Sequence, residues 1–141
     1  MPRAKDGTAR LHVPEGPPVP LEIAASYRSR TQGLLGRDTI DGALLLTPAA
    51  SVHTFRMRFA IDVAYLDRNL KVLAVRTMQP GRLGLPRPRA RHVLESAANT
   101  MTDWGLRPGI SVRFAHEGQG PADDDGQEGR GRRGRGRGPG R

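Results

Sequence analysis

Residues 61–77 read IDVAYLDRNLKVLAVRT, and this stretch decides the fold. Two runs rich in aliphatic residues, 61–66 and 71–77, flank residues 67–70. Val, Ile and Tyr favour strands, whereas Asp and Asn favour turns because their side chains hydrogen-bond the nearby backbone. The stretch therefore predicts a β-hairpin.

Short apolar runs continue this pattern on both sides of the hairpin. Turn residues separate them, and residues 79–88 are rich in Pro and Gly, which predicts a long loop. A short helix is expected at residues 99–104, ended by Gly105, because a positive φ costs glycine little. We expect further strands at residues 21–25, 43–46, 51–55, 92–95 and 110–114, and a turn or short helix at residues 29–37. Six or seven short strands with one minor helix predict a mainly β fold, a small β-sandwich or a partly open barrel.

Composition divides the chain into three parts. Prolines crowd the end of residues 1–20, which we expect to be a disordered lead-in. Residues 21–116 hold the apolar runs and are expected to form one small β domain. Residues 117–141 contain one aliphatic residue and no aromatic residue, so they cannot bury enough apolar surface to offset the entropy of ordering. This tail, first acidic and then rich in Arg and Gly, is expected to be disordered.

The formal net charge of the chain is +9. From residue 118 to residue 141, six arginines and four acidic residues give a net charge of only +2, so most of the excess lies elsewhere. The tail still offers nucleic-acid-binding candidates, namely Arg130, Arg132, Arg133, Arg135 and Arg137. It has no aromatic residue to stack on bases, and its Asp run competes for the same arginines. Non-specific contact with polyanions is therefore the plainer expectation.

Several classes of site are absent from the sequence. No cysteine is present, which excludes disulfides, thiolate zinc sites and a cysteine nucleophile. No apolar run approaches the roughly 18 residues of a membrane span, and the first twenty residues hold no apolar core of a signal peptide. We therefore expect a cytoplasmic protein. The four histidines are scattered and no phosphate-binding or dinucleotide-binding motif occurs, so neither a metal nor a cofactor is expected.

Five segments in order carry a family resemblance. Residues 30–37 read RTQGLLGR, residues 42–46 GALLL, residues 52–63 VHTFRMRFAIDV, residues 93–95 VLE and residues 104–109 WGLRPG. Together they resemble the Domain of Unknown Function 192 family (DUF192), in its short-loop, actinobacterial-like form. The resemblance implies a compact β-sandwich-like fold with a small helix and implies no activity, because the family has no established one. For actinobacterial-like members it further implies an association with pilus or secretion assembly machinery.

Asn99 departs from the family pattern, which usually has Gly before the small helix. Asn tolerates the left-handed conformation better than most residues, so we expect the turn to survive.

Polar residues with chemical potential gather around the expected strand at 51–55. Strand alternation would place His53 and Met57 on one face, together with Phe55, and Arg58 on the other. In a functional interpretation, His53 and Asp62 perform acid–base chemistry or bind a cation in a cleft. In a structural interpretation, Arg58 pairs with Asp62 and His53 is hydrogen-bonded in a packed layer. The missing second metal-spaced histidine favours the structural interpretation.

Glu95 is the other carboxylate of interest. It follows Val93-Leu94, so it should be half inside the fold and in need of a partner. Arg30 or Arg37 could supply a bidentate one. Such a network would be structural as readily as an anion-binding site.

The sequence leads to one main hypothesis and two alternatives. The main one is a non-enzymatic module that binds a small ligand or another protein near His53. One alternative is a hydrolase or carbohydrate-active enzyme that uses Asp62 and Glu95 as paired carboxylates with His53; the other is nucleic-acid binding through the tail. The ligand-binding candidates are Arg30, Arg37, His53, Met57, Arg58, Asp62 and Glu95.

Overall fold

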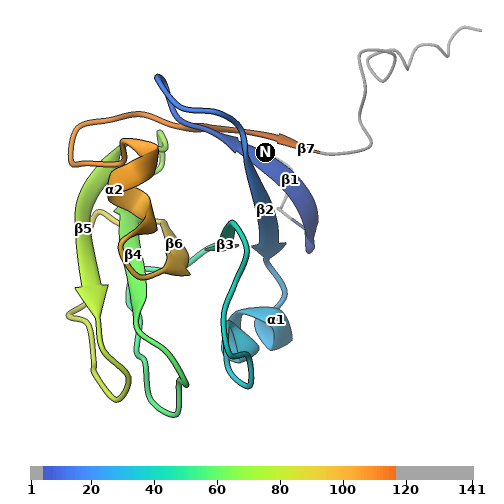
Figure 1. Ribbon diagram of the computed structural model, residues 1–141, viewed down its shortest axis with the longest axis vertical. Helices are drawn as coiled ribbons and strands as arrows, with labels where there is room; N and C mark the ends of the chain where they lie inside the picture. The colour runs from blue at the N-terminus through green and yellow to red at the C-terminus, as the bar shows by residue number, and fades with distance from the viewer. Residues whose placement is uncertain (1–4, 117–141) are drawn as a thin grey trace, which may run out of the picture.

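Seven strands form one mixed sheet in residues 5–116, the part of the chain that the computed structural model describes (Figure 1). They are β1 (Gly7–His12), β2 (Val19–Ala24), β3 (Ala43–Leu46), β4 (Ile61–Leu66), β5 (Val72–Met78), β6 (His92–Ala97) and β7 (Arg113–His116). Two short helices, α1 (Tyr27–Gln32) and α2 (Thr100–Trp104), complete the described elements. The mainly β prediction is confirmed, and the segment expected to be a turn or short helix at residues 29–37 is the helix α1 followed by a turn at residues 33–36.

The strand order is β5-β4-β6-β3-β2-β1-β7. Only β2 and β3 pair in parallel within the described sheet; the other neighbours are antiparallel. The segment before β7 contacts the start of β5, since Val72 N donates to Ile110 O at 2.8 Å and Gly109 N donates to Val72 O at 2.8 Å. The two edges of the sheet thus approach each other at one end without closing it.

The hairpin that decides the fold is present as β4 and β5. Every residue of β4 is buried, because both faces of this strand are covered. At the turn, Asp67 Oδ1 accepts hydrogen bonds from Asn69 N at 2.8 Å and Lys71 N at 3.0 Å. Asp67 therefore closes the turn in the manner expected from its side chain.

The helix α2 also follows the sequence prediction. Asn99 takes the left-handed conformation at φ 70°, and Gly105 ends the helix at φ 84°. Leu106 N donates to Met101 O at 3.0 Å, and both of these side chains are buried in the same cluster. The turn before the helix therefore forms with Asn99 at the position where the family pattern usually has Gly.

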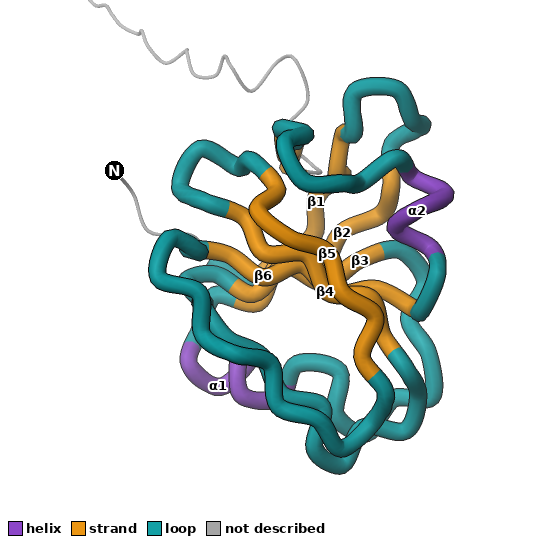
Figure 2. The backbone as a smooth tube through the Cα atoms, turned by 90° about the vertical axis from the view of Figure 1, so that its left-hand side faces the viewer, coloured by secondary structure: helices purple, strands orange, loops and turns teal. Residues whose placement is uncertain are grey.

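Alternating strand residues bury one apolar cluster on each face of the sheet. The first core includes Leu66, Leu94 and Met101, the last of these from α2. The second core includes Leu44 and Val63. Loop residues such as Leu34, Ile40, Val52 and Met57 cover the second core, and Figure 2 shows long loops beside α1 at the end of the strands away from α2.

The prediction for residues 1–20 is wrong in its central part. Residues 7–12 form β1, which pairs with β2 on one side and β7 on the other. Ala9 and Leu11 are fully buried. The crowded prolines that suggested a lead-in lie in the connection between β1 and β2, and Pro20 stands within β2.

The expected strand at residues 51–55 is also absent. Only His53 makes a strand-like bridge there, to Leu83. A turn follows at Phe55 and Arg56, where Arg56 has φ 62°. The turn breaks the alternation, so His53 and Phe55 are exposed whereas Met57 is buried. The expectation that these three side chains share one face is therefore wrong.

Candidate functional site

A pocket of about 90 Å³ opens between α1, the loops that follow β3, and strand β6. Its lining residues are Arg30, Thr31, Gln32, Gly33, Leu34, Leu35, Leu46, Ser51, Val52, His53, Met57 and Glu95. We call it the Glu95 pocket. Four of the sequence candidates line it: Arg30, His53, Met57 and Glu95.

Glu95 lies in the middle of β6 and points toward the second core. In the sheet register it stands opposite Leu44 of β3 and Val63 of β4, and residues that pair directly share a face. Glu95 is 5% exposed. Burial among apolar neighbours raises the pKa of its carboxyl group to about 7, because the charged form is poorly solvated there.

The Glu95 carboxyl group has no bonding partner within residues 5–116. No backbone or side-chain group donates a hydrogen bond to it, and no cation pairs with it. The carboxyl oxygens are not fully enclosed by protein atoms. Since Glu95 lines the pocket, the small exposed fraction of its side chain opens into the pocket. A buried acid that faces a pocket without a partner is unusual, since nearly all buried polar groups are hydrogen-bonded.

Arg30 projects from the last turn of α1 and lines the same pocket without reaching Glu95. Its Nε donates to Ala25 O at 3.2 Å and its Nη1 donates to Pro48 O at 3.3 Å. These carbonyl groups lie just after β2 and just after β3. The guanidinium is therefore held by the backbone, and the ion pair considered for Arg30 and Glu95 does not form.

Gly33 forms the part of the pocket wall next to Glu95. It ends α1 at φ 48° and ψ −127°, a conformation that favours glycine. A Cβ atom added here would lie 3.9 Å from Glu95 Oε1 and 4.0 Å from Leu46 Cδ2. The missing side chain keeps the approach to the carboxyl group wide.

Asp6 fixes α1 from a position that the sequence interpretation assigned to the lead-in. Its carboxylate accepts hydrogen bonds from Ala25 N (2.6 Å), Ser26 N (2.8 Å), Ser26 Oγ (2.9 Å) and Ser29 Oγ (2.6 Å). These bonds, that from the Ser29 hydroxyl foremost, hold the pKa of Asp6 well below its usual range. A lone acid before a strand carries no local signal of this role, because its partners lie about twenty residues further along the chain.

His53 and Met57 line the pocket from the loop after β3. The His53 ring stacks on Phe55 with ring centroids 5.0 Å apart, and its Nδ1 accepts from Phe55 N at 3.3 Å. His53 is exposed, so it lies at the rim, whereas buried Met57 belongs to the apolar wall. His53 is therefore not the packed, hydrogen-bonded core histidine of the structural interpretation.

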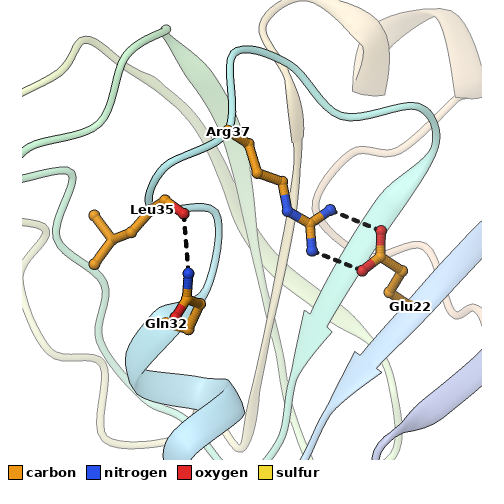
Figure 3. Close-up of polar contacts among 4 residues, drawn as sticks. All are labelled: Glu22, Gln32, Leu35 and Arg37. Atoms are coloured by element: carbon orange, nitrogen blue, oxygen red, sulfur yellow. Dashed lines mark hydrogen bonds and ion pairs between the residues drawn. The ribbon is translucent and has the colours of Figure 1, made fainter.

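Arg37 has a different partner from the one considered. It forms a bidentate ion pair with Glu22 of β2, with both N–O distances 2.8 Å (Figure 3). This pair lowers the pKa of Glu22, chiefly through the hydrogen bond from Arg37. Figure 3 also shows Gln32 Nε2 donating to Leu35 O, at 3.2 Å, which closes the turn after α1. Arg37 thus braces the chain after α1 and does not line the pocket.

Asp62 and Arg58 do not pair with each other either. Arg58 makes an exposed ion pair with Asp38 at 3.1 Å. Asp62 is 2% exposed and accepts from Thr77 Oγ1 at 2.7 Å and Met101 N at 3.1 Å. It pairs in register with Ser96, the residue after Glu95, so the two carboxylates point to opposite faces of the sheet.

Two further features bear on the sequence expectations. Within residues 5–116, no three His, Asp or Glu side chains gather closely enough to hold a metal ion, and no helix is long and apolar enough to cross a membrane. The tail arginines, Arg130 to Arg137, lie outside the described residues, so their contact with nucleic acid stays a prediction.

Two relatives match about two thirds of this chain in sequence. UPF0127 protein PH1112 of Pyrococcus horikoshii is 35% identical over 99 residues, which cover 67% of this chain and 81% of that protein. UPF0127 protein PYRAB11210 of Pyrococcus abyssi is 31% identical over 97 residues, covering 65% and 78% of the two chains.

A solved structure shares the fold at low sequence identity. A protein of unknown function from Novosphingobium aromaticivorans matches with a TM-score of 0.66 at 17% identity, covering 77% of this chain and 84% of that one. Residues 11–114, which include every residue that lines the Glu95 pocket, match the family described as "DUF192: Uncharacterized ACR, COG1430". The chain therefore belongs to the DUF192 family.

Proposed function

We propose that this protein is a binding module whose Glu95 pocket takes a small polar ligand. The observation that supports the proposal is the Glu95 carboxyl group, which is buried, lacks a hydrogen-bonding partner in residues 5–116 and faces the pocket. A ligand that donates a hydrogen bond to this group would supply what the described part of the protein does not.

The energetic argument rests on the cost of an unsatisfied buried acid. Leaving a buried polar group without a partner costs roughly 1–3 kcal/mol, and more if the group is charged. Folds retain such groups chiefly where they serve a purpose, and carboxylates with strongly shifted pKa values concentrate at functional sites. Ligand binding would recover part of this free energy, so the same feature that weakens the empty fold strengthens the complex.

The arrangement supports binding better than paired-carboxylate catalysis. Glycosidic chemistry needs two carboxyl groups facing one cleft, about 5–10 Å apart. Asp62 lies on the opposite face and its oxygens are occupied by Thr77 and Met101. His53, at the rim, is the one other titratable side chain besides Arg30 among the residues that line the pocket.

A nuclear magnetic resonance titration tests the proposal with two hydrogen-bond donors, ethylamine and acetamide. We expect at least one of them to shift the backbone amide signals of Gly33, Val52 and Glu95 in a saturable manner at pH 8. Glu95→Gln should weaken the binding of ethylamine, because the amide carbonyl still accepts a hydrogen bond but carries no charge to pair with the ammonium group. Glu15→Gln is the matched control, since Glu15 is exposed and lies outside the pocket.

The proposal fails if none of ethylamine, acetamide and L-alanine produces a saturable shift, or if Glu95→Gln binds ethylamine as the wild type does. A cytoplasmic location and an association with pilus or secretion machinery stay predictions from the sequence; cell fractionation and a pull-down from the native cell would test them.

A further inference from the structure

Two opposite charges line the Glu95 pocket without touching each other. Arg30 comes from α1 and Glu95 from β6, and no hydrogen bond or ion pair joins them. An arginine and a carboxylate in one pocket ordinarily pair, since a bidentate contact satisfies both. The contacts that hold Arg30 and Glu95 apart therefore bear on the kind of ligand that could bridge the two groups.

The backbone holds Arg30 away from Glu95. Carbonyl oxygens of Ala25 and Pro48 accept its Nε and Nη1. Its Nη2 donates no hydrogen bond within the described residues, so this side of the guanidinium is available to a ligand. Glu95 is equally fixed, because its strand is paired with β3 and β4 on both sides.

Apolar side chains form part of the remaining wall, beside the polar Thr31, Gln32 and Ser51. Leu34, Leu46, Val52 and Met57 all line the pocket. The volume of about 90 Å³ corresponds to roughly three molecules of liquid water. Such a pocket takes a ligand with few heavy atoms, or one end of a larger ligand.

We propose that the ligand is a small zwitterion, specifically a free α-amino acid with a short side chain. Its ammonium group donates to the Glu95 carboxylate, its carboxylate accepts from Arg30, and its side chain contacts the apolar wall. A ligand with only one charge would satisfy one of the two protein groups and leave the other unpaired. This inference rests on the proposed function, since it names the ligand class of the same pocket.

Binding of an ammonium group requires Glu95 to be ionised. The charged or titratable groups that line the pocket with it are Arg30 from α1 and His53 from the loop after β3, while its neighbours on β3 and β4 are Leu44 and Val63. Since burial raises the pKa of Glu95 to about 7, the zwitterion should bind more weakly at pH 5.5 than at pH 8.

Three matched ligands test the inference: L-alanine, ethylamine and propionate. Ethylamine lacks only the carboxylate of alanine, and propionate lacks only its ammonium group. By nuclear magnetic resonance titration of the full chain at pH 8, we expect L-alanine to bind at least tenfold more tightly than either analogue. Arg30→Gln should reduce the affinity for L-alanine to that for ethylamine, whereas Arg58→Gln, which changes an exposed arginine outside the pocket, should leave it unchanged.

The wild-type comparison decides the matter even if Arg30→Gln weakens α1. Equal affinities for L-alanine and ethylamine would overturn the inference that the ligand is a zwitterion and leave the proposed binding function intact. Tighter binding of propionate than of L-alanine would overturn it as well. If none of the three ligands nor acetamide produces a saturable shift, both the inference and the proposed function fail.

Discussion

Two buried carboxylates on neighbouring strands have opposite surroundings. Asp62 on β4 and Glu95 on β6 lie one register position apart, and they are 2% and 5% exposed. Asp62 faces the side of the sheet where α2 packs and accepts hydrogen bonds from Thr77 and Met101. Glu95 faces the side covered by loops and accepts none within residues 5–116.

The difference shows that burial by itself does not identify a functional acid. Asp62 is a structural residue because its hydrogen bonds join β4 to β5 and to the start of α2. Glu95 is buried to a similar degree, and the lack of a partner distinguishes it. The following substitutions test whether this distinction holds.

The largest effect is expected from Asp62→Ala. The change removes two hydrogen bonds to a buried acceptor and leaves the Met101 N–H without its partner, so the free energy of unfolding should fall by about 4 kcal/mol. Urea denaturation measures this loss. Asp38→Ala is the control, because it removes an exposed pair with Arg58 and should cost less than about 1 kcal/mol. Similar losses in both variants would mean that Asp62 does not fasten α2.

Glu95→Gln should act in the opposite direction and depend on pH. Between pH 4.5, the ordinary pKa, and about 7, the unfolded chain releases the Glu95 proton while the folded chain retains it. The wild type therefore loses stability across this range, and the loss stays constant above it. The glutamine variant has no proton to release and does not show this loss. At pH 8 its free energy of unfolding should therefore exceed that of the wild type by on the order of 3 kcal/mol, and at pH 4 the two should not differ. A destabilised variant at pH 8 would indicate that Glu95 has a stabilising partner.

Gly33→Ala should weaken both the fold and the pocket. An alanine at φ 48° is strained and should cost about 1–2 kcal/mol, and its Cβ would stand 3.9 Å from Glu95 Oε1. Gly36→Ala is the matched control, because it has φ 82° with no atom within 4 Å of the added Cβ. We expect comparable losses of thermal stability but reduced L-alanine affinity only for Gly33→Ala. Equal affinities in the two variants would remove Gly33 from the ligand path.

The smallest effect is expected from the Glu22–Arg37 pair, a carboxylate that has its partner but is partly exposed. A double-mutant cycle with Glu22→Gln and Arg37→Gln should give a coupling of about 0.5–1 kcal/mol at pH 7. Because the hydrogen bond from Arg37 lowers the pKa of Glu22, this stabilisation is present above the ordinary pKa and is lost as the pH falls through the lowered one. A coupling that persists at pH 2 would contradict this assignment.

Local signals in the sequence were sufficient for several elements of the fold. The apolar run at residues 43–46 forms β3 with the same bounds, and the hairpin and the glycine-ended α2 are where they were expected. The failures arose where distant pairing overrides local pattern. Strand β1 exists because β2 and β7 flank it, and the turn at Arg56 interrupts what looks locally like a strand.

The candidate site was predictable in its residues but not in its contacts. Arg30, His53, Met57 and Glu95 line one pocket, and all four stand among the sequence candidates. The sequence does not determine the partners of Arg37 and Arg58, because it contains several acidic residues and does not show which of them the fold brings close. The structure pairs Arg37 with Glu22 and Arg58 with Asp38. The faces of β4 and β6 decided that Asp62 and Glu95 never meet, and this depends on a register between strands about thirty residues apart.

The attachment of α1 through Asp6 has a consequence for where the working domain begins. Helix α1 has no buried residue, and six residues are too few for a helix to be stable alone. A chain trimmed to the region that matches the family, residues 11–114, would lack Asp6 and four of the six residues of β1. We expect such a fragment to lose the wall that carries Arg30 before it loses the sheet. The region that matches the family is thus shorter than the unit that shapes the pocket.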